Sequence, residues 1–91
     1  MSLLTRHALV RQQQRGIPPL IVDWLLKYGD EKHDHRGAVI RYFSKKSKRR
    51  LRKDIGKLAF RRFEDWLRSY LVEAEGRVIT VGHRTKNLKL H

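Results

Sequence analysis

The sequence predicts an α+β fold in which an N-terminal helical hairpin and a long basic helix pack on a small antiparallel sheet of three to four strands. Apolar residues at helical spacing near the N-terminus and in the middle of the chain predict the helices. Two stretches rich in β-branched and aromatic residues, joined by Glu75-Gly76, predict a β-hairpin near the C-terminus. A length of 91 residues fits one domain, residues 1–91.

The N-terminal part predicts two helices joined by a stiff elbow. Thr5 suits the N-cap of a helix over residues 6–15, and Gly16 suits the left-handed position that ends such a helix. The prolines at 18–19 disfavour helix before them and fit the first turn of a second helix, which apolar spacing extends over residues 20–28. We therefore expect these two helices to form the hairpin.

Two further segments and the C-terminal hairpin predict the sheet. Residues 30–37 are polar and allow a short strand, and residues 38–43 are rich in the side chains that strands favour. A two-residue loop at Glu75-Gly76 predicts that Ala74 pairs with Arg77, Val72 with Ile79 and Tyr70 with Val81. The predicted core face of the hairpin then consists of Tyr70, Val72, Ile79 and Val81.

A basic helix, capped by Ser44, is predicted within residues 45–68. Its apolar residues recur on one side at helical spacing: Leu51, Ile55, Leu58, Ala59, Phe63, Trp66 and Leu67. Asp54 is the only acid between residues 41 and 62. An unbroken helix of this length would span about 36 Å, so we expect a bend near Gly56.

The charge of the chain predicts a polyanionic partner. Lys and Arg number 22 against 9 Asp and Glu, a formal net charge of +13, and self-repulsion of this size opposes folding. Nucleic acid is the first expectation, an acidic protein the second and an anionic membrane the third, with a merely solvated surface as the alternative. The expected nucleic-acid-binding residues are Arg15, Arg41, Lys45, Lys46, Lys48, Arg49, Arg50, Arg52, Lys53 and Lys57.

Several classes of site and location are excluded or disfavoured. The chain has no Cys, which excludes disulfides, thiolate metal sites and cysteine nucleophiles. His33 and His35 lie among acids but lack a distant ligand that would complete a metal site, so we expect no metal and no cofactor. The N-terminus lacks the apolar core of a signal peptide, and no apolar run could span a membrane, so we expect a cytoplasmic protein.

Histidines beside cations suggest a catalytic site. His83 is expected at the open end of the last strand, where Arg84 and Lys86 could hold a phosphate while the imidazole transfers a proton. His7 and Arg11 form a stripe with Arg15 on the first helix that could grip a phosphodiester backbone. The alternatives are a surface histidine that merely ends a strand and a solvated polar helix face.

Two motifs support a resemblance to a known group of proteins. The chain resembles a family of small uncharacterised bacterial domains in two stretches. The first contains His7-Ala8, Arg11 and Arg15-Gly16-Ile17, and the second is Val78-Ile79-Thr80-Val81-Gly82-His83-Arg84. Those domains are similar to RelE/ParE-type toxins and to the wider class of barnase-, EndoU- and colicin-like ribonucleases. The resemblance implies helices on a small antiparallel sheet, RNA as substrate, no cofactor and an acidic antitoxin as partner. The long basic helix departs from the toxin pattern.

The leading hypothesis is therefore a toxin-like, metal-independent endoribonuclease of a toxin–antitoxin system. In it, His83 acts as acid or base, and Arg84, Lys86, Arg11 and Arg41 stabilise phosphate charge. A second hypothesis keeps DNA or RNA binding by residues 45–62 without catalysis. A third makes the basic face a dock for an acidic protein, as in an inhibitor.

Overall fold

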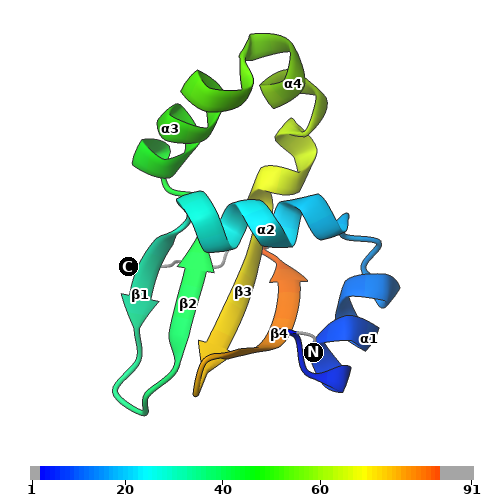
Figure 1. The fold of residues 1–91 in the computed structure, drawn as a ribbon, viewed down its shortest axis with the longest axis vertical. Coiled ribbons are helices and arrows are strands. Elements are labelled where there is room, and N and C mark those ends of the chain that lie inside the picture. The colour runs from blue at the N-terminus through cyan, green and yellow to red at the C-terminus, as the bar shows by residue number, and fades with distance from the viewer. Residues whose placement is uncertain (1–2, 85–91) are drawn as a thin grey trace.

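The computed structural model describes residues 3–84 and has an α+β fold (Figure 1), which confirms the predicted class. Four strands form an antiparallel sheet in the sequential order β1-β2-β3-β4. The helices are Arg6–Gln14 (α1), Pro19–Tyr28 (α2), Lys45–Ile55 (α3) and Lys57–Arg62 (α4), with a 3₁₀ helix at Glu64–Arg68 (η1). The strands are Asp30–His33 (β1), Val39–Tyr42 (β2), Ser69–Ala74 (β3) and Arg77–His83 (β4). None of the helices within residues 3–84 has the length and apolar character needed to cross a membrane.

The ends of α1 are fixed by the expected caps. The Thr5 side chain accepts a hydrogen bond from the backbone N–H of Ala8 at 3.2 Å. At the other end Gly16 has a φ of 63°, and its N–H bonds the carbonyl of Gln13. The N–H of Ile17 bonds the carbonyl of Gln12, which completes the paired hydrogen bonds of a Schellman motif. The chain therefore leaves α1 in a defined direction.

The two N-terminal helices are consecutive, but their main contacts are with different partners. α1 packs along β4 through its buried Ala8, whereas α2 crosses the end of the sheet and contacts α3, β2 and β3 (Figure 1). Ile21 and Leu25 of α2 are fully buried in one core cluster together with Phe43, Leu71 and Val81. This arrangement places α2 between the sheet and the basic region.

The register of the β3–β4 hairpin differs from the prediction. Glu75 and Gly76 have φ values of 53° and 78°, as a two-residue hairpin turn requires, and Ala74 pairs with Arg77 as expected. A bulge then shifts the pairing, so that Val72 lies opposite Thr80 rather than Ile79 and Tyr70 lies opposite Gly82 rather than Val81. The predicted core face was therefore wrong at three of its four residues. Leu71, Val78 and Val81 are buried, Tyr70 and Val72 are only half-buried, and Ile79 is 37% exposed.

The basic segment forms an arm, defined here as residues 45–68 (α3, α4 and η1), between β2 and β3. Its first turn is capped by Ser44, whose side-chain oxygen accepts from the N–H of Ser47 at 3.0 Å. The expected break occurs at Gly56, which has φ 88° and ψ 163°. Because Gly56 interrupts the helical phase, Leu58 does not continue the apolar side of α3. It is 86% exposed, so its predicted place on the packed side was wrong.

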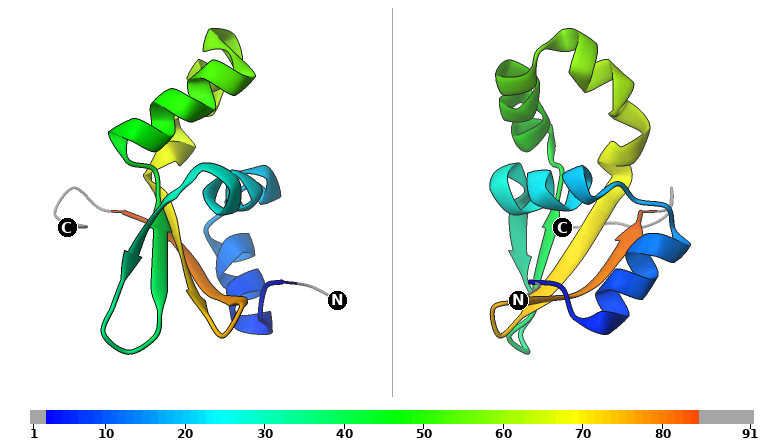
Figure 2. Two further views of the ribbon diagram at one scale, coloured as in Figure 1. Left: turned by 60° about the vertical axis from the view of Figure 1, so that its left-hand side comes forward. Right: turned by 45° about the vertical axis from the view of Figure 1, so that its right-hand side comes forward.

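The arm lies beyond the end of the sheet rather than flat on it (Figure 2), and its main contacts are internal and with α2. Leu51 of α3 and Leu67 of η1 are buried in the core cluster. The Tyr28 hydroxyl also donates a hydrogen bond of 2.8 Å to Asp54. The only acid of α3 is thus turned toward α2, which leaves the cations on the remaining faces of the helix.

Candidate nucleic-acid interface

The cations of α3 fall into two stripes that face different ways. Residues three and four apart share a side of a helix. The inner stripe consists of Lys45, Lys48, Arg49 and Arg52, all of which line one cavity with Phe60 of α4. The outer stripe consists of Lys46, Arg50 and Lys53, which are exposed and do not line that cavity. The helix therefore presents two basic surfaces in different settings.

The cavity between α3 and α4 has a volume of about 380 Å³ and opens to solvent. Its surface is mostly apolar although four of its five lining residues are cations. Lys and Arg side chains commonly cover apolar surface with their methylene stems while their charged ends stay in water. The result is an apolar floor at Phe60 with a positively charged rim.

The acids within the described part of the chain form no ion pairs with this rim. All ion pairs within residues 3–84 involve Glu31 or Arg41, on β1 and β2. Within the same residues, no cation of either α3 stripe is paired with a carboxylate. A cluster of unpaired positive charge on an ordered helix is the electrostatic signature of a surface that meets an anion.

A second group of cations meets the inner stripe at Lys48. The pKa of Lys48 is lowered from its ordinary value by burial and by the positive charges of Arg84 and Arg68, while Glu64 acts in the opposite direction. Lys48 also lines a cavity with Glu64, Asp65 and Arg68 of η1, so two acids share this cavity with the cations. The charges of Arg84 and Arg68 act against that of Lys48, and Glu64 offsets part of this repulsion.

Arg84 is held in place by the backbone of two other segments. Its N–H donates to the carbonyl of Arg68 at 2.7 Å, and its Nη2 lies 3.5 Å from the carbonyl oxygen of Phe43. The guanidinium carbon lies 5.8 Å from the centre of the Tyr42 ring. Its Nε–H is buried and has no hydrogen-bond partner in the described part of the chain.

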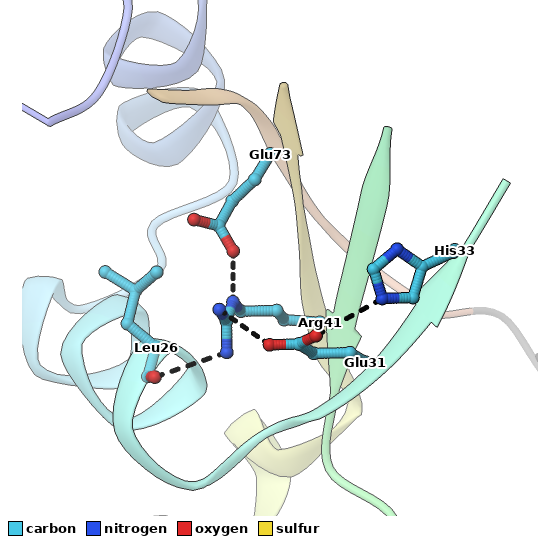
Figure 3. Close-up of polar contacts among 5 residues, drawn as sticks. All are labelled: Leu26, Glu31, His33, Arg41 and Glu73. Atoms are coloured by element: carbon cyan, nitrogen blue, oxygen red, sulfur yellow. Dashed lines mark hydrogen bonds and ion pairs between the residues drawn. The ribbon is translucent and has the colours of Figure 1, made fainter. Parts of the chain in front are cut away.

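Arg41 was expected to bind phosphate, but the structure uses it internally (Figure 3). Its Nε donates to Glu73, its Nη2 lies 2.9 Å from Glu31, and its Nη1 lies 3.4 Å from the carbonyl oxygen of Leu26. His33 contacts the other oxygen of Glu31 at 3.4 Å. These contacts occupy all three nitrogens of the guanidinium, so Arg41 is not free to bind phosphate as predicted.

His83 lies at the end of β4, as expected, and contacts an indole and a hydroxyl. Its ring centre is 5.4 Å from that of Trp66 at an interplanar angle of 31°, and its Nδ1 lies 3.5 Å from Oγ of Ser69. The neighbouring Arg84 side chain instead contacts Tyr42 and Phe43. Lys86, the third residue of this predicted group, lies outside the described residues.

His7 is not brought together with His83. The N–H of Thr5 bonds the carbonyl of Val78, so the exposed His7, the second residue of α1, lies near the start of β4. Five residues of strand, about 17 Å, separate Val78 from His83. Arg11 is half-buried, and its Nε has no hydrogen-bond partner among residues 3–84, whereas Arg15 is exposed at the C-terminal end of α1. His7 and His83 thus lie at opposite ends of β4.

Two residues of the candidate interface were missed from the sequence. Arg68 was not singled out, because nothing local shows that η1 approaches Lys48 and Arg84. Phe60 was overlooked although it is an aromatic residue off the predicted apolar side of the basic helix, which was a usable signal. Lys57, which was predicted, lines a neighbouring cavity that also contains Phe60.

The described residues offer little for metal binding. Between residues 3 and 84, no three His, Asp or Glu side chains come close enough together to hold a metal ion.

Comparison of the chain with protein-family models, with curated proteins and with solved structures finds no match.

Proposed function

We propose that the protein binds the phosphate backbone of nucleic acid through the inner stripe of α3 together with Arg68 and Arg84. The observation that carries this proposal is that the cations of the inner stripe line one cavity and are not paired with acids of the described chain. Clustering them costs folding free energy through repulsion, and bound phosphates would offset that cost. The arm extends from the end of the sheet, where a long polymer can approach it (Figure 2).

Two triple variants with the same change in charge test this proposal. One replaces Lys45, Arg49 and Arg52 of the inner stripe by Ala, and the matched control replaces Lys46, Arg50 and Lys53 of the outer stripe. Each phosphate contact contributes about 0.7 to 0.9 to the slope of log affinity against log salt concentration. The inner variant is therefore expected to lower the slope by roughly 2 to 3, while the control keeps most of the wild-type slope.

The measurement is fluorescence anisotropy with a labelled oligonucleotide at four or more salt concentrations. Equal losses in the two variants would show that net charge alone matters and would refute the assignment to the inner stripe. No salt-dependent binding by the wild type would refute the proposal entirely. A stable complex with an acidic protein that survives nuclease treatment would instead favour the docking hypothesis.

A metal-independent endoribonuclease activity is the second candidate. The observation that favours it is that the half-buried His83 ends β4 one residue before Arg84, although the two side chains contact different residues. Cleavage of RNA by its own 2′-hydroxyl needs a proton-transferring group beside positive charge. An acidic antitoxin would be the partner that the toxin resemblance implies.

Incubation of labelled RNA with the protein in EDTA tests this second candidate. Cleavage by the wild type and not by His83→Ala, with RNA affinity unchanged, would support it. The control is Arg68→Ala, which we expect to weaken binding and cleavage together. No cleavage by the wild type at protein concentrations that saturate the RNA would refute the catalytic role of His83.

A further inference from the structure

Phe60 is placed unusually for an aromatic residue, because cations surround it on both sides. It lines the cavity of about 380 Å³ with the inner stripe and a second cavity of about 440 Å³ with Lys57, Arg61 and the acid Glu64. Arg52 lines both cavities. The ring is only partly buried, and its neighbour Leu58 is almost fully exposed. The basic rim of α3 and α4 thus encloses accessible apolar surface.

Phosphate binding alone does not account for this apolar surface. A backbone phosphate is recognised by charge and hydrogen-bond donors, which Arg49 and Arg52 can supply. An aromatic ring contributes nothing to such a contact. Part of the Phe60 ring packs against the core cluster, and leaving the remainder in water is unfavourable. A nucleobase has the complementary chemistry, because it has a flat face that stacks on an aromatic ring while its phosphates remain near flanking cations.

The state of the base decides which nucleic acid fits. In a duplex each base is paired and stacked on its neighbours, and removing it from the stack costs a few kcal/mol. A single strand offers bases without that cost and can follow a short, curved basic surface. The Phe60 cavity, with its cationic rim and apolar floor, therefore suits an unpaired base better than the outside of a duplex.

We infer that the cavity between α3 and Phe60 holds an unpaired base of a single-stranded nucleic acid, whose flanking phosphates contact Arg49 and Arg52. This inference rests on the proposed nucleic-acid binding and adds a preference for single strands to it. The Arg68–Arg84 group then contacts only backbone. Stacking on a base face is shared by RNA and DNA, so both belong in the test.

The test compares Phe60→Leu with Phe63→Leu, a matched loss of a phenyl ring three residues away. The Phe63 ring packs edge-to-face on Trp24 at 5.1 Å and does not line either Phe60 cavity. Affinities are measured by anisotropy for unstructured single-stranded RNA and DNA and for duplexes of equal length at one salt concentration. Phe60→Leu keeps an apolar side chain but loses the ring, so folding is preserved better than with Ala.

We expect Phe60→Leu to weaken single-strand binding roughly tenfold, within the range that one stacked base contributes, and to leave duplex affinity unchanged. Phe63→Leu should leave the ratio of single-strand to duplex affinity as in the wild type. Equal effects of Phe60→Leu on single strands and duplexes, or no effect on either, would overturn the base site while the backbone proposal stands. If the wild type binds neither ligand, both proposals fail. A loss with only one of RNA or DNA supports the site and identifies its ligand.

Discussion

Replacing Gly56 by Ala is expected to lower the free energy of unfolding by about 2 kcal/mol. Gly56 joins α3 to α4 with φ 88° and ψ 163°, a backbone region that is essentially restricted to glycine and costs other residues about 1–3 kcal/mol. An added Cβ would meet no heavy atom within 4 Å, so the cost comes from the backbone conformation and not from a clash. For a domain of this size, 2 kcal/mol corresponds to a fall in Tm of about 8 to 16 °C.

Gly16 provides the matched control, because it also has a positive φ and open space around its Cβ position. Its φ of 63° is in the left-handed helical region, which Asn adopts far more readily than Ala does. Gly16→Asn should therefore be milder than Gly16→Ala. At Gly56 the backbone lies outside that region, so Gly56→Asn should be no milder than Gly56→Ala.

Urea unfolding followed by far-UV circular dichroism measures all four variants. The slope of unfolding free energy against urea should stay constant, so that midpoints compare stabilities directly. Wild-type stability in Gly56→Ala would refute the reasoning, because the break between α3 and α4 would then not require this backbone conformation. Recovery of stability in Gly56→Asn would refute it as well.

Three further predictions follow from single contacts. Tyr28→Phe removes the hydrogen bond to Asp54 and should lower the free energy of unfolding in urea by about 1 kcal/mol. The same substitution should have a smaller effect in a chain that already carries Asp54→Asn. Lys48 has a pKa lowered by burial and by two arginines, so its protonated form opposes folding. Wild-type stability should therefore rise relative to Lys48→Met as pH increases from the folded-state pKa of Lys48 toward 10.5, as alkaline denaturation profiles would test. The backbone N–H groups of Arg36 and Ala38 lower the pKa of Asp34 below 3.8. The stability that ionised Asp34 contributes is therefore present above pH 3.8 and lost as the pH falls through its folded-state pKa. NMR titration measures that pKa, and Asp34→Ala should remove this part of the loss of stability in acid.

Local signals in the sequence predicted the elements well. Thr5 and Ser44 cap helices through hydrogen bonds from their side chains to backbone three residues away, and Gly16 ends α1. Capping depends only on residues close in sequence, so these features could be predicted. The turn at Glu75-Gly76 was predicted for the same reason. The break at Gly56 followed from the length of the basic segment and from the conformational freedom of glycine.

What failed depended on long-range packing. The bulge in the β3–β4 pairing displaces Ile79 from the core, and alternation along one strand does not reveal an extra residue. Arg41 is predicted to bind nucleic acid because it precedes the basic segment, but Glu73 becomes its neighbour only after β2 pairs with β3. Arg68 approaches Lys48 only because the arm returns to the sheet beside β4. Charge content could be predicted, whereas the distribution of charges between ion pairs and free surface could not.

The position of the arm between paired strands has a consequence for the order of folding. The two outer hairpins close through short loops over residues 34–38 and 75–76, whereas β2 and β3 pair across residues 43–68. Closing a longer loop costs more chain entropy, and contacts distant in sequence slow folding. We therefore expect the two halves of the sheet to join late, once α3 has docked on α2. The segment proposed to bind nucleic acid would then also set the rate at which the sheet is completed.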